Sequence, residues 1–200
     1  WTSPTGNGSW KQIAQNGDPT DWNALGRITL AIAPSNEDIV YALFNNGKNN
    51  NPPSNPQLEA DLWQYNAANS IWTNYSAKLP DEDGETINSA GNDPFSIQGG
   101  YDLVISVKPD NENFLIIGGT NLYKINNITT DSMFERRIGG YKSNQGYSLY
   151  DVGGIKHHAD IHSVKFDINN PKILYTGTDG GVHKTEDITV SFVAWSNLNN

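Results

Sequence analysis

The sequence predicts an all-β fold built from repeated, small antiparallel sheets. Two observations carry this prediction: a strand–turn–strand pattern that occurs three times, and a composition rich in turn-forming residues. The 200 residues include 19 Gly and 10 Pro, and hydrophobic residues make up only 36%. Such a composition is typical of many short strands joined by turns. No segment shows the apolar spacing of three and four residues that an amphipathic helix requires, so a helix-rich fold is not expected.

The three copies of the pattern align without gaps through their first turn. The turns coincide at offsets of 75 residues, from Pro34 to Pro109, and 59 residues, from Pro109 to Ile168. Each turn is followed by an apolar strand, which contains Val40-Tyr41, Leu115-Ile116 and Leu174-Tyr175 respectively. The repeats exceed the roughly 40–50 residues of a propeller repeat, and long loops account for the excess. We therefore expect each copy to be one four-stranded blade of a β-propeller.

The expected organisation is a series of blades separated by loops. Residues 1–25 are expected to supply a linker and, over 8–14, the closing strand of a preceding blade. Blades are expected over 26–80, 99–138 and 158–200, with loops over 81–98 and 139–157. Because a propeller closes with about 4–8 blades, three blades predict a piece of a larger propeller, most readily one of six to eight blades. The remaining blades of the same parent chain are the expected partners of its open edges.

Charge and composition restrict the class of partner. The formal charge is −9 and Lys and Arg are scattered apart from Arg136-Arg137, so no basic face for nucleic acid is expected. No apolar run approaches the length of a membrane span, so membrane insertion is not expected. The absence of Cys excludes disulfides, thiolate metal sites and Cys nucleophiles. A chain that begins at Trp1 without a signal-peptide pattern fits a processed secreted protein or a fragment.

The repeat alignment also gathers polar residues at one end of the predicted channel. Gly26–Ile28 aligns with Tyr101–Leu103 and with Asp160–His162, and the first strand of each blade lines the channel. Because side chains alternate along a strand, Asp160 and His162 share a face, and His158 joins them if the strand reaches that far. The candidate ligand-binding residues are therefore Arg27, Tyr101, Asp102, His158, Asp160 and His162.

Several kinds of chemistry fit this group. His158, Asp160 and His162 offer imidazole and carboxylate ligands for a divalent metal, Ca or Zn. The same residues could move a proton, bind ligand hydroxyls, or only close the channel mouth by bonding to one another. Outside the group, His157 is expected to be solvated, and His183 to pack or bond locally beside Asp179. A calcium role for Asp179 lacks the spaced carboxylates of an EF-type loop, and a structural turn is the alternative.

Two further features have a functional and a structural interpretation. The acidic run Asp81–Glu85 could hold a cation, although such a run is usually a solvated loop. The aromatic residues Trp63, Tyr65, Trp72 and Tyr75 could stack on sugars. Strand alternation and packing inside the blade explain most of them without a ligand.

Several segments together resemble secreted bacterial proteins with neuraminidase-type (Asp-box) repeats, which include sortilin-like and xyloglucanase-like propellers. The segments are Gln98–Leu103, Pro109–Asn111, Gly118–Lys124, His158–His162 and Thr178–Lys184, and the match covers most of residues 26–198. The resemblance implies a β-propeller and a secreted or cell-surface location in bacteria.

An Asp-box is a turn of the pattern Ser/Thr-x-Asp-x-Gly-x-Thr-Trp, whose Asp bonds backbone amides while the aromatic residue plugs the blade. Thr185–Asp187, followed by Phe192 and Trp195, is a degenerate copy that lacks the Gly. The resemblance therefore implies structural roles for Asp187 and Trp195. The equivalent segments, residues 66–72 and 126–134, lack the motif.

Two functions follow as hypotheses. The first is non-enzymatic binding of a carbohydrate or a protein at the channel mouth and long loops. The alternative is a propeller-type glycoside hydrolase in which Asp102 and Asp160 act as the carboxylate pair. A sialidase is not expected, because it needs three arginines around the substrate carboxylate, and the chain has only Arg27 and the adjacent Arg136 and Arg137. Neither a phosphate-binding Gly-rich loop nor a Ser nucleophile elbow is present.

Overall fold

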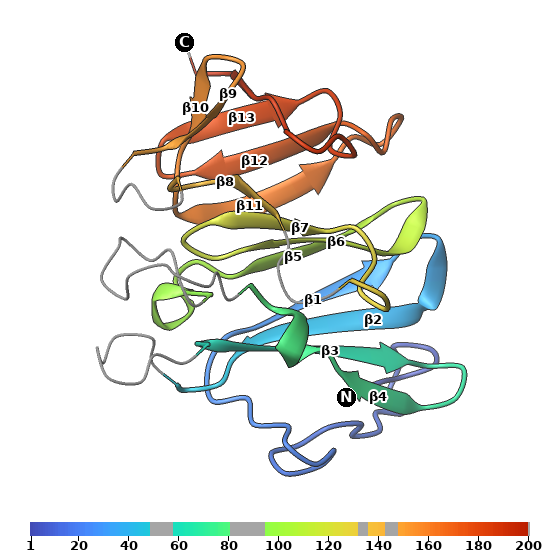
Figure 1. Cartoon of the computed structure of the whole chain (residues 1–200). Coiled ribbons are helices and arrows are strands. Elements are labelled where there is room, and N and C mark those ends of the chain that lie inside the picture. The colour runs from blue at the N-terminus through green and yellow to red at the C-terminus, as the bar shows by residue number, and fades with distance from the viewer. Residues whose placement is uncertain (49–57, 81–94, 132–135, 143–147, 200) are drawn as a thin grey trace.

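The computed structural model describes residues 1–48, 58–80, 95–131, 136–142 and 148–199. Its strands form three four-stranded antiparallel sheets and one two-stranded hairpin. The three larger sheets lie next to one another in chain order (Figure 1). In each of them the strands pair in sequence order, which is the up-and-down connection of a propeller blade.

Each blade follows one copy of the repeat. Blade 1 consists of β1 (Ile28–Ala33), β2 (Asn36–Asn45), β3 (Ala60–Asn66) and β4 (Ile71–Asn74). Blade 2 consists of β5 (Val104–Lys108), β6 (Asn111–Gly118), β7 (Leu122–Ile125) and β8 (Arg136–Gly139). Blade 3 consists of β11 (Ile161–Phe166), β12 (Leu174–Thr178), β13 (Gly181–Thr185) and β14 (Ser196–Asn197).

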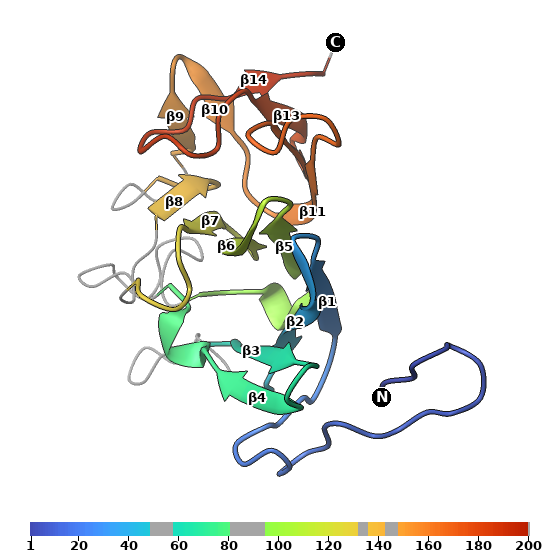
Figure 2. The same ribbon diagram turned by 90° about the vertical axis from the view of Figure 1, so that its right-hand side faces the viewer.

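The first strands of the three blades lie side by side. Strand β5 contacts both β1 and β11, and Figure 2 shows these three strands along one edge of the molecule, with the later strands further out. This radial arrangement of four-stranded sheets around their first strands is that of consecutive β-propeller blades. The predicted fold class is therefore confirmed.

The strand register confirms the repeat alignment. The last regular pair before the first turn occupies the same place in every blade: Ile32 opposite Val40, Val107 opposite Leu115, and Phe166 opposite Leu174. Blades 1 and 2 also share a register shift immediately after this pair, at Ala33 and Lys108. The gap-free alignment made from the sequence therefore places equivalent residues in equivalent positions.

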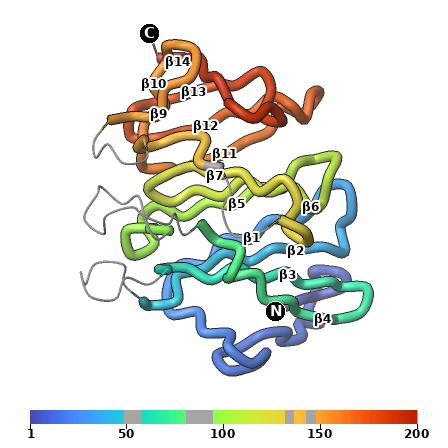
Figure 3. Tube along the Cα trace, viewed as in Figure 1, coloured from blue at the N-terminus to red at the C-terminus, as the bar shows by residue number. Residues whose placement is uncertain are grey.

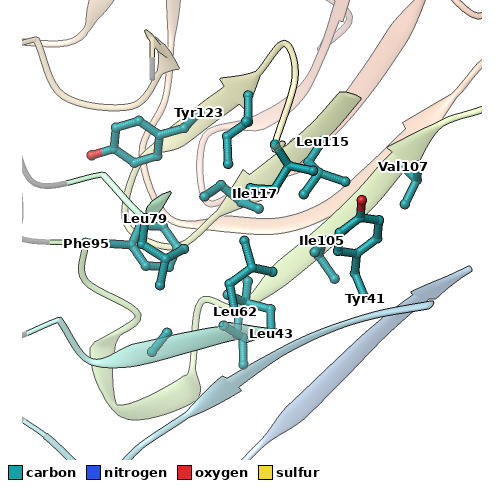
Figure 4. Close-up of a cluster of buried hydrophobic side chains, with 14 of the residues drawn as sticks. Tyr41, Leu43, Leu62, Leu79, Phe95, Ile105, Val107, Leu115, Ile117 and Tyr123 are labelled. Carbon is teal, nitrogen blue, oxygen red and sulfur yellow. The ribbon is translucent and has the colours of Figure 1, made fainter. Parts of the chain in front are cut away.

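Two apolar clusters join the blades. Between blades 1 and 2 lie Tyr41, Leu43, Ile105, Leu115 and Ile117, all buried (Figure 4). Between blades 2 and 3 a second cluster includes Val104, Ile116, Ile161, Leu174 and Trp195. Val104 and Ile105 face opposite neighbours because successive side chains of a strand point to opposite faces. Each such burial stabilises the fold by about 1.5–3 kcal/mol, so the blade interfaces fix the relative position of the first strands.

Two expectations about the segments outside the blades are wrong. Residues 8–14 form no strand; the N-terminal 25 residues contain only isolated bridges, such as Thr2 with Lys11 (Figure 2). A strand needs a neighbouring ladder to satisfy its backbone, and this segment has none beyond those bridges. The predicted loop over 139–157 instead contains the hairpin β9 (Tyr150–Val152) and β10 (Ile155–His157).

The other connections contain little regular structure among the described residues. The short 3₁₀ turn η1 (Ser76–Lys78) follows β4, and a second, η2 (Gln98–Gly100), precedes β5. The course of the chain through these connections can be followed in Figure 3. The acidic run at 81–85 lies outside the described residues. No helix in the described ranges is long and apolar enough to cross a membrane.

Candidate functional site

Residues from all three blades meet at one end of the first strands, and we call this group the channel mouth. It consists of Arg27, Gln98, Tyr101, Asp102, Asp160, His162 and Asp179. Arg27, immediately before β1, donates from Nη1 to the carbonyl oxygen of Tyr101 at 3.0 Å and of Gly100 at 3.3 Å. The Tyr101 ring in turn meets the His162 ring edge-on, with centroids 5.0 Å apart. These contacts connect blades 1, 2 and 3 directly.

Asp102 is fully buried at the mouth. Neither of its carboxylate oxygens accepts a hydrogen bond within the described part of the chain. The imidazole of His162 lies beside it, with Nδ1 3.5 Å from Asp102 Oδ1, while His162 Nε2 contacts Asp179 Oδ1 at 2.5 Å. The imidazole therefore stands between two carboxylates and is hydrogen-bonded to Asp179.

Asp160 is held by backbone contacts with blade 2. Its N–H donates to the Thr120 carbonyl at 2.8 Å, and Ile161 N–H donates to the Gly119 carbonyl at 3.0 Å. Asp160 has a φ of +61°, a left-handed conformation that Asp tolerates better than most residues and that costs of order 1 kcal/mol. Gln98 Nε2 donates to its Oδ1 at 2.8 Å. The strained backbone thus directs this carboxylate toward the mouth.

Gly119 is required for this arrangement. A Cβ on Gly119 would lie 2.0 Å from the Ser96 carbonyl oxygen, which itself accepts a hydrogen bond from Thr120 N–H. No side chain fits at that separation. The absence of a Cβ therefore lets the segment before η2 approach blade 2 and brings Gln98 to Asp160.

The pKa of Asp102 is raised to about 7. Burial is the largest cause, because it penalises the charged form. The negative charge of Asp160 raises the pKa further, the nearby His162 lowers it, and a hydrogen bond with Asp160 and the charge of Asp179 add to the increase. Two carboxylates can share a hydrogen bond only if one is protonated, so the protonated form of Asp102 can donate to Asp160. Asp102 therefore keeps its proton to a higher pH than an ordinary aspartate does.

The structure brings most of the predicted ligand-binding residues together. Arg27, Tyr101, Asp102, Asp160 and His162 meet as the repeat alignment predicted. His158 makes other contacts: its Nδ1 contacts the Ala159 carbonyl at 2.9 Å, and its ring packs against Gly180. In the part of the chain that the structure describes, no three His, Asp or Glu residues are placed to hold a metal. The His158–Asp160–His162 set is therefore not assembled as a metal site.

Sequence reasoning missed two members of the mouth. Asp179 follows β12 directly after Thr178, which pairs with Ile161, so the register places it opposite Asp160, and its N–H donates to the Asp160 carbonyl at 3.3 Å. His162 lies in the irregularity between Ile161 and Ser163, and its side chain contacts Asp179 from there. Pairing the two strands residue by residue could have found it. Gln98 lies in η2 with a φ of +49°, and no sequence pattern signalled its contact with Asp160.

The expectation that His157 is solvated is wrong. His157 is fully buried, with Nδ1 contacting the His158 carbonyl and Nε2 contacting Thr176 Oγ1, each at 2.8 Å. Its ring lies between those of His183, at 4.6 Å, and Trp195, at 4.4 Å. Burial, reinforced by the neighbouring His183, lowers the pKa of His157 to about 3. His157 therefore belongs to the core between β10 and blade 3 and takes no part in the mouth.

Asp187 and Trp195 occupy structural positions. Asp187 Oδ1 accepts hydrogen bonds from Thr189 N–H at 2.8 Å and Thr189 Oγ1 at 2.5 Å. The buried Trp195 donates from Nε1 to the Ile138 carbonyl at 2.6 Å, across the interface between blades 2 and 3. In blade 2, Asn127 accepts from Thr129 N–H and Oγ1 in the same way. The turn is thus present in blade 2 with Asn in place of Asp.

The aromatic residues proposed as sugar-stacking candidates pack within blade 1. Trp63 and Tyr65 are buried, and Trp72 donates from Nε1 to the Ile13 carbonyl at 2.7 Å. Trp22 lies against Phe44, Trp63 and Trp72. Packing of the N-terminal segment on blade 1 accounts for this group.

Comparison with known proteins shows distant similarity to solved structures. No protein-family model matches the sequence, and no curated protein matches it. Among solved structures, the chain is similar to a GH74 enzyme of Niastella koreensis, with a TM-score of 0.48 and 18% sequence identity. The similarity covers 84% of this chain and 23% of the enzyme, so the chain spans about a quarter of its length. The assignment of blades rests on the sheet topology and register of this chain.

Proposed function

We propose that the channel mouth binds a carbohydrate without hydrolysing it. The observation that carries this proposal is Asp102, a buried carboxyl group at the mouth that accepts no hydrogen bond from the residues that the structure describes. A buried acceptor without a partner costs about 1–3 kcal/mol, and sugar hydroxyls are donors that would recover it. Gln98 and Asp160 supply further polar groups, and the exposed ring of Tyr101 offers an apolar face for a sugar ring. A few polar groups beside an aromatic face are typical of a small-ligand site.

The biological setting is part of the same proposal. The motifs that resemble Asp-box and sortilin-like proteins support a secreted or cell-surface bacterial propeller, whose other blades belong to the same parent chain. A carbohydrate at the mouth would then contact several blades. A protein ligand lacks a comparable feature in its favour, because the described residues at the mouth form a small polar group.

A glycoside hydrolase is the second candidate, and one observation favours it. A glycosidase needs a carboxylic acid that remains protonated near neutral pH, and the pKa of Asp102 is raised to about 7. The spacing opposes this function. Catalytic carboxyl groups stand about 5–5.5 Å or 6.5–9.5 Å apart, whereas Asp102 and Asp160 are within hydrogen-bonding reach of each other. The pair would have to separate before a glycosidic bond could lie between them.

Glycan-array binding combined with a reducing-sugar assay tests the proposal. We expect binding of a carbohydrate, a loss of about tenfold or more in affinity on Asp160→Asn or Tyr101→Ala, and no release of reducing sugar. Asp38→Asn is the matched control, because Asp38 is exposed on β2. Release of reducing sugar that Asp102→Asn abolishes would establish the hydrolase instead. Failure of every glycan to bind, or binding unaffected by both variants, would refute a carbohydrate site at the mouth.

A further inference from the structure

The unpaired carboxyl group of Asp102 specifies the charge of the missing partner. Both oxygens are buried and accept no hydrogen bond from the described residues. Most buried polar atoms in folded proteins have a partner, so an orphaned carboxylate is an unfilled acceptor. A hydroxyl would supply one hydrogen, whereas a charged donor would also compensate the buried charge.

The groups around Asp102 leave negative charge uncompensated. Asp160 and Asp179 act on it with like charge, and His162 acts with opposite charge. His162 bonds through Nε2 to Asp179, and its Nδ1 is 3.5 Å from Asp102, too far for a hydrogen bond. The hydrogen bond of His162 is thus made to Asp179, and Asp102 has no donor among the described residues.

Arg27 does not supply the missing charge. Its guanidinium donates from Nη1 to the main-chain carbonyls of Gly100 and Tyr101. The electrostatic balance next to Asp102 is therefore set by two neighbouring carboxylates and one imidazole. A neutral sugar hydroxyl would leave that balance unchanged.

The donor set fits an ammonium group better than a metal ion. A divalent metal requires several ligands at short range, and no suitable group of three is present among the described residues. A primary ammonium is compact and carries three N–H donors. The two oxygens of Asp102 and the adjacent carboxylate of Asp160 can accept from it. Burial is the main cause of the raised pKa of Asp102, and the negative charges of Asp160 and Asp179 add to it.

Two partly exposed side chains, those of Tyr101 and His162, lie next to Asp102 at the mouth. Tyr101 is 60% exposed and its ring only touches His162 edge-on. The His162 side chain is 34% exposed. Because Asp102 itself is fully buried, access of a ligand to it requires these two side chains to rotate.

We infer that the channel mouth selects an amino sugar with a free, protonated amine, which displaces the His162 ring and donates hydrogen bonds to Asp102. This inference rests on the proposed carbohydrate site and specifies its substrate class. It predicts discrimination between two ligands that differ only at one nitrogen. Acetylation removes the charge and two of the N–H donors and leaves the sugar ring and its linkages unchanged.

Isothermal titration calorimetry at about pH 6.5 tests the inference with two probes, the β-1,4-linked trisaccharide of glucosamine and its fully N-acetylated counterpart. We expect the amine to bind at least about tenfold more tightly. Asp102→Asn should reduce this preference to less than about twofold, and Asp38→Asn should retain it. His162→Ala, which uncovers Asp102, should keep or increase it. Thermal melting of each variant confirms that it is folded, and Asp160→Asn provides a second test if Asp102→Asn unfolds.

The outcomes separate this inference from the proposed function. Equal binding of the two trisaccharides, or tighter binding of the acetylated one, overturns amine selection and leaves carbohydrate binding in place. A preference for the amine that persists in Asp102→Asn and Asp160→Asn also overturns it, because other residues would then recognise the charge of the amine. If neither these trisaccharides nor any glycan on the array binds, the carbohydrate site itself is refuted.

Discussion

Protonation of His157 should make the fold acid-labile, and replacing it should remove much of that sensitivity. The ring is buried between His183 and Trp195, and its pKa is lowered from 6.5 to about 3. The native state therefore holds this imidazole neutral, and the unfolded state binds the proton more readily. The resulting stability is fully present above pH 6.5 and is lost as the pH falls from 6.5 toward 3.

The magnitude follows from the size of the change in pKa. One pKa unit corresponds to about 1.4 kcal/mol, so lowering the pH from 7 to about 4.5 should reduce the free energy of unfolding by about 3 kcal/mol through His157 alone. The pKa of His183 is also lowered, chiefly by burial, and adds to the effect in the same direction. A loss of 3 kcal/mol is a large part of the typical 5–15 kcal/mol stability of a domain.

Urea unfolding measured at pH 7, 6, 5 and 4.5 tests this reasoning in the wild type and in His157→Gln, whose amide can still bond to Thr176. The variant should be less stable at pH 7, and its disadvantage should shrink by about 3 kcal/mol by pH 4.5. In the wild type, the His157 ring signals in the NMR spectrum should not titrate above pH 4.5. Parallel pH dependence of the two proteins, or a His157 titration near pH 6.5, would show that the ring is not held neutral by burial.

Two further predictions concern the structural residues of the blades. Trp195→Ala should lower the free energy of unfolding by about 3–5 kcal/mol, as expected for a buried aromatic residue. Phe192→Ala, at a site 75% exposed, should change it by less than about 0.5 kcal/mol. Similar effects of the two variants in urea unfolding would disprove the role of Trp195 as the aromatic residue that fills the blade core. Asp187→Ala should cost about 1 kcal/mol because Thr189 loses both its hydrogen bonds to Oδ1, and Glu186→Ala serves as the neighbouring control. An Asp187→Ala variant as stable as the wild type would show that the turn does not depend on the carboxylate.

The blades were predictable because two independent signals agreed. The alternation of apolar and polar residues predicts the strands, and the repeat offsets show which strands are equivalent. The sequence alignment alone therefore superposes Ile32, Val107 and Phe166. Superposition of the first strands in turn placed Asp102 near His162. The contact at 3.5 Å follows from register and from the rule that first strands line the axis.

The remaining features depend on tertiary contacts that leave little trace in local sequence. In the sequence His157 resembles an ordinary polar residue before a strand. In the structure it ends β10, and its ring is buried against those of His183 and Trp195. The hairpin of β9 and β10 is short, and Gly and Ser around it resemble an ordinary loop. Residues 8–14 have the apolar pattern of a strand, but pattern alone forms no ladder without a paired neighbour.

The titration of Asp102 tests the central claim most directly, since the candidate site depends on a buried carboxyl group held beside Asp160 and His162. Carbon-detected NMR of the Asp carboxyl groups between pH 3 and pH 9 would follow it in the wild type and in Asp160→Asn. The structure predicts a pKa of about 7 for Asp102, and a clear decrease when the charge of Asp160 is removed. A pKa near the ordinary value of 3.8, unchanged in the variant, would contradict the geometry of the channel mouth and the functions proposed from it.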